Sequence, residues 1–259
     1  MICTYGERIQ NVPYVLLPPR PDVVYAISWQ CGDFDQNIIP RDLCRDDVVV
    51  EAFKDRGLSN NRNHALSMVK TPYAIIADDD LRYDNTELNE VIDTIKQNPD
   101  VDIFCFRAKS KQGIWVKDYP QQRYNYKQQP KGAYISSWEI VVKKTKDLPQ
   151  FDPHYGIGAP LLGCGEEEIF IIDAAKKGLG IEYFPICLTR LCDTNTTGQL
   201  FHIEASVQRA KGAVLFRRYG LLLAILKAIK TSVVFCETNK THILKEMIKG
   251  IYYGWKYSI

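Results

Sequence analysis

The sequence AIIADDD at residues 74–80 is an apolar run that ends in three consecutive carboxylates. A short apolar run of this kind is typical of a buried strand, so we expect a strand that ends at the aspartates. Helical spacing of apolar residues lies on either side of it, at 59–69 and 85–95. Further strand-like runs, rich in β-branched and aromatic residues, occur at 23–29, 48–53 and 101–106. This alternation predicts an α/β fold with a mostly parallel sheet flanked by helices.

Helix caps and the sheet edge follow from the same pattern. We expect Ser59 to cap the first helix and Asn85 or Thr86 to cap the second. Ligands of parallel α/β sheets bind beyond the carboxyl ends of the strands. The DDD triplet is predicted to lie at one of these ends.

The charge is unevenly distributed along the 259 residues. The whole chain has 33 basic and 31 acidic residues, a net charge of +2, which argues against a dedicated nucleic-acid binder. Residues 205–259 hold ten Lys or Arg and two Glu, a net of +8, and the preceding residues have a net of −6. We therefore expect a globular domain over residues 1–205 and a basic, apolar helical region over 206–259.

Localisation is predicted from what the sequence lacks. The start, MICTYGERIQ, carries charges where a secretion signal needs its apolar core. No run of about 18 uncharged apolar residues indicates a membrane span. The eight cysteines form no C-x-x-C pair and are expected to be reduced thiols. We expect a cytoplasmic protein.

Three motifs carry the predicted chemistry. Adjacent carboxylates repel one another, and a Mn²⁺ or Mg²⁺ ion would offset this repulsion at Asp78 and Asp80, although a solvated turn or a helix cap is the alternative. In GLSNNRN at 57–63, Arg62 enters a helix where it could face a diphosphate. In GCGEEEIF at 163–170, three glutamates open a helix, and one of them could act as a general base.

In this order, the motifs resemble family 2 glycosyltransferases of the GT-A fold, the type that synthesises bacterial polysaccharides and glycans. The resemblance covers roughly residues 14 to 200 and includes FDPHYGIGAPLLGCGEEEIF and IEYFP. It implies transfer of a sugar from a nucleotide-diphosphate sugar, usually with inversion. It also implies a D-x-D motif in which Asp78 lies toward the nucleoside and Asp80 ligates Mn²⁺ or Mg²⁺, with Asp79 in the same site.

The family's catalytic base is the second residue of a Glu-Asp pair, which falls on Glu167 here. Glu166 stays open as the alternative, because Glu replaces Asp at this position, and Glu168 is expected to face solvent. The nucleotide pocket is assigned to Ser28, Gln30 and Arg62, with the run at Leu16 or the run at 23–30 as the family's first strand. Arg190 stands near the place where many relatives have a histidine.

Two further segments have alternative interpretations. The aromatic residues between 112 and 138 could stack on sugar rings or simply pack a β-loop region. The helix expected over 212–230 could lie on anionic lipid at the inner face of the cell membrane, or it could close the core with a solvated basic face.

We therefore expect a metal-dependent, inverting glycosyltransferase. Its donor would be a nucleotide-diphosphate sugar, with a UDP-sugar favoured, and its acceptor a hydroxyl of a glycan or a lipid-linked molecule. The alternative is a non-catalytic nucleotide-sugar- or carbohydrate-binding module of the same fold. The acidic GEEE motif favours the enzyme, because a binding module needs no base.

Overall fold

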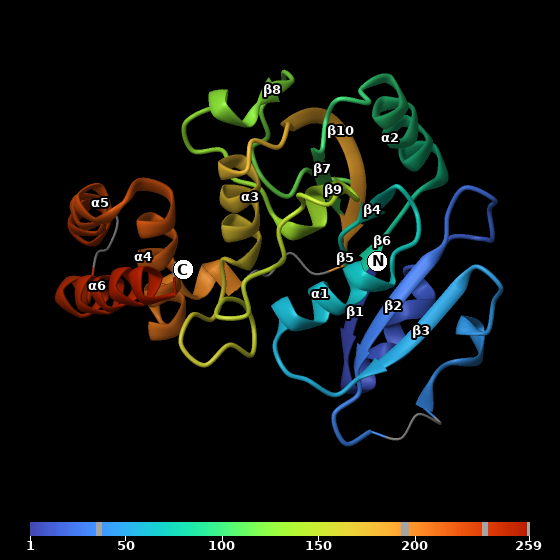
Figure 1. Ribbon diagram of the computed structural model, residues 1–259, viewed down its shortest axis with the longest axis horizontal. Helices are drawn as coiled ribbons and strands as arrows, with labels where there is room; N and C mark the ends of the chain where they lie inside the picture. Colours follow the sequence, from blue (N-terminus) through green and yellow to red (C-terminus); the bar gives the residue numbers. More distant parts are fainter. Residues whose placement is uncertain (35–37, 193–196, 235–237, 258–259) are drawn as a thin grey trace. The chain divides into compact units, whose positions relative to one another are not determined.

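The computed structural model describes residues 1–34, 38–192, 197–234 and 238–257 (Figure 1). The chain divides into two compact units. The first comprises residues 1–55, 61–149 and 174–194, and the second comprises residues 56–60, 150–173 and 195–259. The seven cysteines of the described residues are free thiols, and Cys236 lies outside those residues.

A parallel sheet forms one part of the first unit. Its strands are β1 (Ile2–Tyr5), β2 (Tyr25–Gln30), β3 (Val48–Phe53) and β5 (Ala77–Asp78), in the spatial order β3-β2-β1-β5. Every pairing is parallel, and Tyr5 lies beside Gln30, which in turn lies beside Phe53. The carboxyl ends therefore meet at one edge, as Figure 1 shows for β1, β2 and β3.

The first strand of this sheet differs from the prediction. It is neither the run at Leu16 nor the run at 23–30 but Ile2–Tyr5, which is hydrogen-bonded on both sides. Ile2 and Cys3 are almost fully buried between the neighbouring strands. A 3-10 helix, η1 (Gly6–Tyr14), follows β1, and the residues around Leu16 form a loop.

A second, mixed sheet completes the first unit. Its spatial order is β4-β9-β7-β10-β6, with β8 paired to β10; only β7 and β10 run parallel. Together, the parallel sheet and this mixed sheet confirm the predicted α/β fold. The strands are β4 (Tyr73–Ile75), β6 (Leu81–Arg82), β7 (Ile103–Ser110), β8 (Tyr124–Asn125), β9 (Ile140–Lys143) and β10 (Ile181–Leu191). The short 3-10 helices of the unit are η3 (Arg41–Leu43), η4 (Tyr126–Gln128) and η5 (Ser137–Glu139).

Both predicted caps are wrong, although both helices form. Helix α2 (Asn85–Gln97) is capped by Asp84, whose carboxylate accepts the backbone N–H groups of Thr86 and Glu87 at 2.8 and 3.1 Å. Helix α1 (Leu58–Met68) begins one residue before Ser59, whose hydroxyl instead donates to the carbonyl of Tyr155 at 2.7 Å. The apolar face of α2 packs on an aromatic core as the spacing predicts: Val91, Ile95, Phe104, Phe106 and Phe184.

The second unit is helical. It contains α3 (Glu166–Lys176) up to residue 173, η6 (Thr197–His202), α4 (Ala205–Tyr219), α5 (Leu221–Val234) and α6 (Lys240–Lys256). The helix expected over 212–230 is broken at Gly220, whose φ of 74° ends α4 and separates it from α5. No helix in the described part of the chain is both long and apolar enough to span a bilayer.

Glycines allow α4 and α6 to cross at backbone contact. A Cβ on Gly250 of α6 would overlap the carbonyl oxygen of Arg209 in α4, and a Cβ on Gly212 of α4 would overlap the carbonyl oxygen of Met247 in α6. Gly254 faces the Cα of Ala213 in the same way, with 3.0 Å between that atom and a built Cβ. The two helices therefore depend on the absence of side chains at these positions.

Replacing Gly250 with alanine tests this crossing. Helix propensity alone would stabilise a helical Gly→Ala change by about 1 kcal/mol. We expect the opposite sign, with a loss of roughly 1–3 kcal/mol in the free energy of unfolding, because the new methyl group has to push the backbones apart. Urea unfolding measures the difference. Thr241→Ala, at an exposed position of the same helix, is the control and should change stability by less than about 0.5 kcal/mol; a Gly250→Ala protein more stable than wild type would contradict the tight crossing.

Candidate active site

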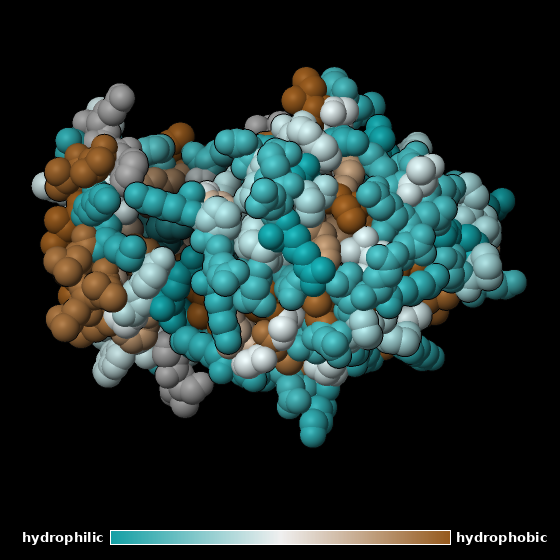
Figure 2. All heavy atoms as spheres, turned by 90° about the horizontal axis from the view of Figure 1, so that it is seen from above, coloured by the Kyte–Doolittle hydropathy of each residue, from teal (hydrophilic) through white to brown (hydrophobic). Residues whose placement is uncertain are grey.

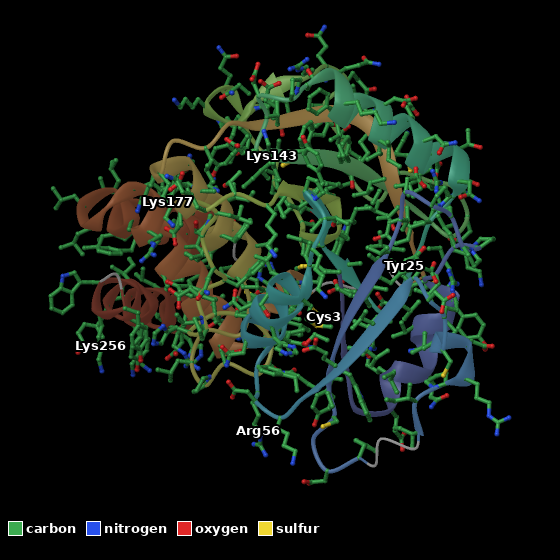
Figure 3. All side chains as sticks on the ribbon, turned by 45° about the vertical axis from the view of Figure 1, so that its right-hand side comes forward. Cys3, Tyr25, Arg56, Lys143, Lys177 and Lys256 are labelled. Atoms are coloured by element: carbon green, nitrogen blue, oxygen red, sulfur yellow. The ribbon has the colours of Figure 1, made fainter. Side chains whose placement is uncertain are left out.

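The DDD triplet begins where the parallel sheet ends. Asp78 is the last residue of β5, and it lies beside Cys3 of β1, which is labelled in Figure 3. Asp79 and Asp80 form the turn into β6. The backbone is therefore not extended through the triplet, and each carboxylate has its own surroundings.

Asp79 points into the protein. Its side chain is 4% exposed and accepts a hydrogen bond from the Thr4 hydroxyl at 2.7 Å. The guanidinium of Arg8 adds a bidentate ion pair, with Nε 2.9 and 3.0 Å from the two carboxylate oxygens and Nη2 on Oδ1. Both oxygens of Asp79 are thus satisfied by β1 and η1, which gives this carboxylate a positioning role.

Asp78 faces a buried arginine. The Nη2 atom of Arg62 lies 3.3 Å from the Oδ1 atom of Asp78, and the Arg62 side chain is only 1% exposed. Arg62 comes from α1, as the sequence predicts for a helix that begins near the sheet edge. A buried guanidinium needs a counter-charge, so this pair fixes both side chains.

Asp80 is the most open member of the triplet. Its side chain is 40% exposed, and its Oδ2 atom lies 3.1 Å from Nη2 of Arg8. Partial burial, together with the neighbouring charges of Asp78 and Asp79, raises the pKa of Asp80 above its ordinary value. A cation that approached this edge would therefore meet Asp80 first and would relieve that repulsion.

The donor set determines what metal this edge could hold. Among the described residues, no group of three or more His, Cys, Asp or Glu side chains is arranged to bind a metal ion. Burial also raises the pKa of the nearby Cys3 thiol to about 12, so it stays protonated. One or two carboxylates can still hold Mg²⁺ or Mn²⁺ when phosphate oxygens and water complete the shell. The chemistry of Asp80 and Asp78 fits that kind of site and does not fit a metal held by protein groups alone.

The two residues predicted from β2 have partners in the first unit. Ser28 is buried, and its hydroxyl lies 2.7 Å from Nδ1 of His64, whose ring stacks on Phe53. Gln30, at the end of β2, donates to the carbonyl of Asp55 at 3.0 Å. The parallel sheet thus brings Ser28, Gln30, Arg62 and the aspartates to the same sheet region, with Gln30 and Asp78 at its carboxyl edge.

The three glutamates open α3 in the second unit. Glu166 is 6% exposed, and its carboxylate lies against Gly156, where a Cβ would come within 3.1 Å of Oε2. Glu167 is partly exposed. Glu168 does not simply face solvent as predicted, because its carboxylate approaches Lys211 at 3.8 Å and Arg218 at 3.9 Å on α4.

Several aromatic residues of the middle segment gather around a cavity of about 150 Å³ in the first unit. A buried glutamate, Glu139, accepts from the Tyr119 hydroxyl at 2.6 Å and pairs with Lys117 at 2.8 Å. Burial raises the pKa of Glu139. Tyr119, Tyr124 and Tyr134 line this cavity.

Arg8 was not predicted from the sequence, and Arg190 was expected near the place of the histidine that many relatives have. Arg8 lies four residues after Thr4 on the segment that leaves β1, and only the strand assignment at Ile2–Tyr5 reveals its position. Arg190 pairs with Glu87 of α2 at 3.0 Å, and Lys109 pairs with the same carboxylate at 3.0 Å. Arg190 is therefore held by α2 in this structure.

Comparison with solved structures gives the fold independently. The crystal structure of S. aureus TarS 1-349 superposes with a TM-score of 0.59 at 13% identity, covering 96% of this chain and 80% of that one. TarS 1-349 in complex with UDP-GlcNAc gives 0.58 at 12% identity, with the same coverage. The complex with UDP gives 0.58 at 13% identity, covering 99% of this chain and 86% of that one. At this identity, the likeness concerns the fold.

Comparison with protein families finds one similarity. No curated protein matches the chain. The model of the family described as glycosyl transferase family 2 matches residues 42–148, which include β3, α1 and the DDD triplet. Residues 42–148 are therefore similar to glycosyl transferase family 2, and the chain has a GT-A-like fold.

Proposed function

We propose that this enzyme transfers a sugar from a UDP-sugar to a hydroxyl of a glycan or lipid-linked acceptor, with inversion and with a divalent metal ion. The observation that carries the proposal is the DDD turn, in which Arg62 and Arg8 counter the charges of Asp78 and Asp79 and leave Asp80 partly exposed. A UDP donor is supported by the fold's likeness to TarS, which has been crystallised with UDP-GlcNAc and with UDP.

The donor side of the proposal rests on charge. A nucleotide diphosphate is an anion and would be repelled by a bare carboxylate at the sheet edge. Mn²⁺ or Mg²⁺, held by Asp80 with Asp78 nearby, would neutralise the diphosphate and improve it as a leaving group. Asp78, whose carboxylate is held by Arg62, would orient the nucleoside. Asp79 would contribute indirectly, by positioning Arg8.

Ser28 and Gln30 complete the proposed nucleotide pocket. Both belong to β2, and Gln30 stands at the carboxyl edge where α/β sheets bind their ligands. Their side chains already have partners in His64 and Asp55, which hold them in fixed orientations. A positioned polar group loses less entropy on binding than a free one.

The acceptor side requires a general base. We assign it to Glu167, which is partly exposed, rather than to Glu166, which is buried against Gly156. The base would take the proton of the acceptor hydroxyl as that oxygen attacks the anomeric carbon opposite the diphosphate. A non-catalytic module of the same fold would give these glutamates no such role.

The cellular setting follows from the acceptor and the charge distribution. We propose that the enzyme works in the cytoplasm, at the inner face of the cell membrane, in polysaccharide biosynthesis. The domain division at residues 1–205 and 206–259 is part of this proposal, with the basic segment serving attachment and the first segment serving transfer.

Asp80→Asn tests the metal site. We expect UDP affinity to lose its Mn²⁺-dependent part, a decrease of at least about 10-fold, because the amide is neutral and a poorer ligand. Calorimetric titration with UDP, with and without Mn²⁺, measures this change. Only the ionised form of Asp80 binds metal, and the pKa of Asp80 is raised. As the pH is lowered, the Mn²⁺-dependent part of UDP binding by wild type should therefore disappear at a higher pH than an ordinary aspartate would give.

Asp79→Asn is the matched control within the triplet. It should lower the free energy of unfolding by roughly 1–3 kcal/mol, because it weakens the buried contacts with Arg8 and Thr4. Asp80→Asn should leave stability within about 0.5 kcal/mol of wild type or raise it. An Asp80→Asn enzyme with unchanged Mn²⁺-dependent UDP binding would contradict the metal assignment.

Glu167→Gln tests the base. The expected result is near-normal UDP binding with sugar transfer slowed by about 10²–10⁴-fold, since a positioned base contributes that much. Product formation under saturating donor gives the rate. Glu166→Gln is the comparison: if it abolished transfer while Glu167→Gln remained active, the base would be Glu166, and if both remained active, neither glutamate would be the base.

A further inference from the structure

Helix α5 exposes an apolar stripe and buries small side chains. The stripe residues follow one another at intervals of four, three and four, and they are 42–78% exposed: Leu222, Leu226, Ile229 and Val233. The opposite face packs inward through Ala224, Ala228 and Ser232, all buried. Leucine and valine normally occupy the inner face of a helix in a protein surrounded by water. Figure 2 shows the resulting group of apolar side chains at its left.

Helix α6 continues the same kind of surface. Ile248, Tyr252 and Trp255 follow at intervals of four and three and are 39–62% exposed. The opposite face of α6 is buried against α4 and α5 through Ile243, Met247 and Ile251. Tyrosine and tryptophan are the side chains that favour the boundary between hydrocarbon and water.

Lysines flank both stripes. Lys230 lies four residues after Leu226 on α5, and Lys245, Lys249 and Lys256 lie three or four residues from Ile248 or Tyr252 on α6, so each shares a helix face with a stripe residue. All four lysines are exposed. Helix α5 contains no acidic residue, and the one glutamate of α6, Glu246, is buried in ion pairs with Arg209 and Lys249. The surface is therefore apolar and positive.

We propose that the outer faces of α5 and α6 form a membrane-binding face that lies on an anionic lipid bilayer. An apolar stripe would enter the boundary of the acyl chains while the lysines stay with anionic headgroups. The 14 residues of α5 span about 21 Å, less than the roughly 30 Å of a bilayer's hydrocarbon core, so this helix would lie in the interface and not cross it.

A second copy of the chain fits this face less well. Two copies meeting through α5 and α6 would bring lysines toward lysines, and like charges oppose association. Anionic headgroups provide the missing negative charge. The proposal gives a physical partner to the membrane location proposed above, and its residues are separate from those assigned to donor binding and catalysis.

Vesicle sedimentation tests the face. Wild type should bind phosphatidylcholine vesicles containing about one third phosphatidylglycerol at low salt, and it should bind pure phosphatidylcholine vesicles at least about 5-fold more weakly, because each lysine near the surface contributes attraction. Salt at about 0.5 M should release most of the protein as charges are screened. Wild type that stays in the supernatant with anionic vesicles at low salt would overturn the proposal.

Variants locate the binding to these helices. The double change Leu222→Ser with Leu226→Ser should weaken vesicle binding at least about 10-fold, since two apolar side chains no longer enter the lipid. Lys245→Gln with Lys256→Gln should weaken binding to anionic vesicles and leave the weak binding to neutral vesicles unchanged. Ile203→Ser, which alters an apolar residue that is 76% exposed outside α5 and α6, is the matched control and should bind as wild type.

Four measurements separate the possible outcomes: circular dichroism, thermal unfolding, UDP affinity and the oligomeric state. Circular dichroism and thermal unfolding should be unchanged in all variants, because the altered residues are exposed. The UDP affinity of the variants should also equal that of wild type. A wild-type protein that does not bind UDP would contradict the proposed function but not the membrane-binding face. Wild type could instead be a dimer that binds no vesicles, with the Leu222→Ser and Leu226→Ser variant a monomer. The face would then be an interface between copies, and the membrane proposal would be wrong.

Discussion

The ion pair between Arg8 and Asp79 is the interaction on which the candidate site depends. Three adjacent carboxylates would repel one another, and a buried, unpaired one would cost several kcal/mol. Arg8 and the Thr4 hydroxyl satisfy both oxygens of Asp79, which turns the middle carboxylate into a link between η1 and the turn after β5. Arg62 provides a counter-charge for Asp78 through its Oδ1 atom. Arg8 also approaches Asp80 at 3.1 Å, and Asp80 stays the most exposed carboxylate of the triplet.

The parts of the fold that could be predicted are those with a clear local sequence pattern. The strand at 48–53 has the predicted bounds, because its β-branched run is bordered by polar residues. The single strand expected before the aspartates is wrong: the apolar run forms β4 and β5, which belong to different sheets. The strand at Ile2–Tyr5 escaped prediction, because four residues followed by Glu7 and Arg8 carry too short a pattern. It forms because β2 and β5 both pair with it, and such long-range pairing is invisible in a local window.

The residue types of the candidate site could be predicted from the sequence, but the directions in which their side chains point could not. Asp78, Asp80 and Arg62 stand near one another as expected, but the backbone does not stay extended through the triplet. The strand ends at Asp78, so the turn sends Asp79 inward and Asp80 outward. Arg8 could have been suspected only after β1 was known, since the partner of a buried carboxylate comes from 71 residues away.

The C-terminal helices show how packing can reverse the usual order of side chains. The crossing of α4 and α6 relies on Gly212 and Gly250, which let a backbone carbonyl of each helix approach a glycine of the other and give the unit a close-packed centre. Helix α5 then needs only a narrow face of Ala224, Ala228 and Ser232 to pack against it. Large apolar residues are not required inside, and on α5 they occupy the outer face instead. Such an arrangement costs solvation free energy in water and loses that cost when the face meets an apolar phase.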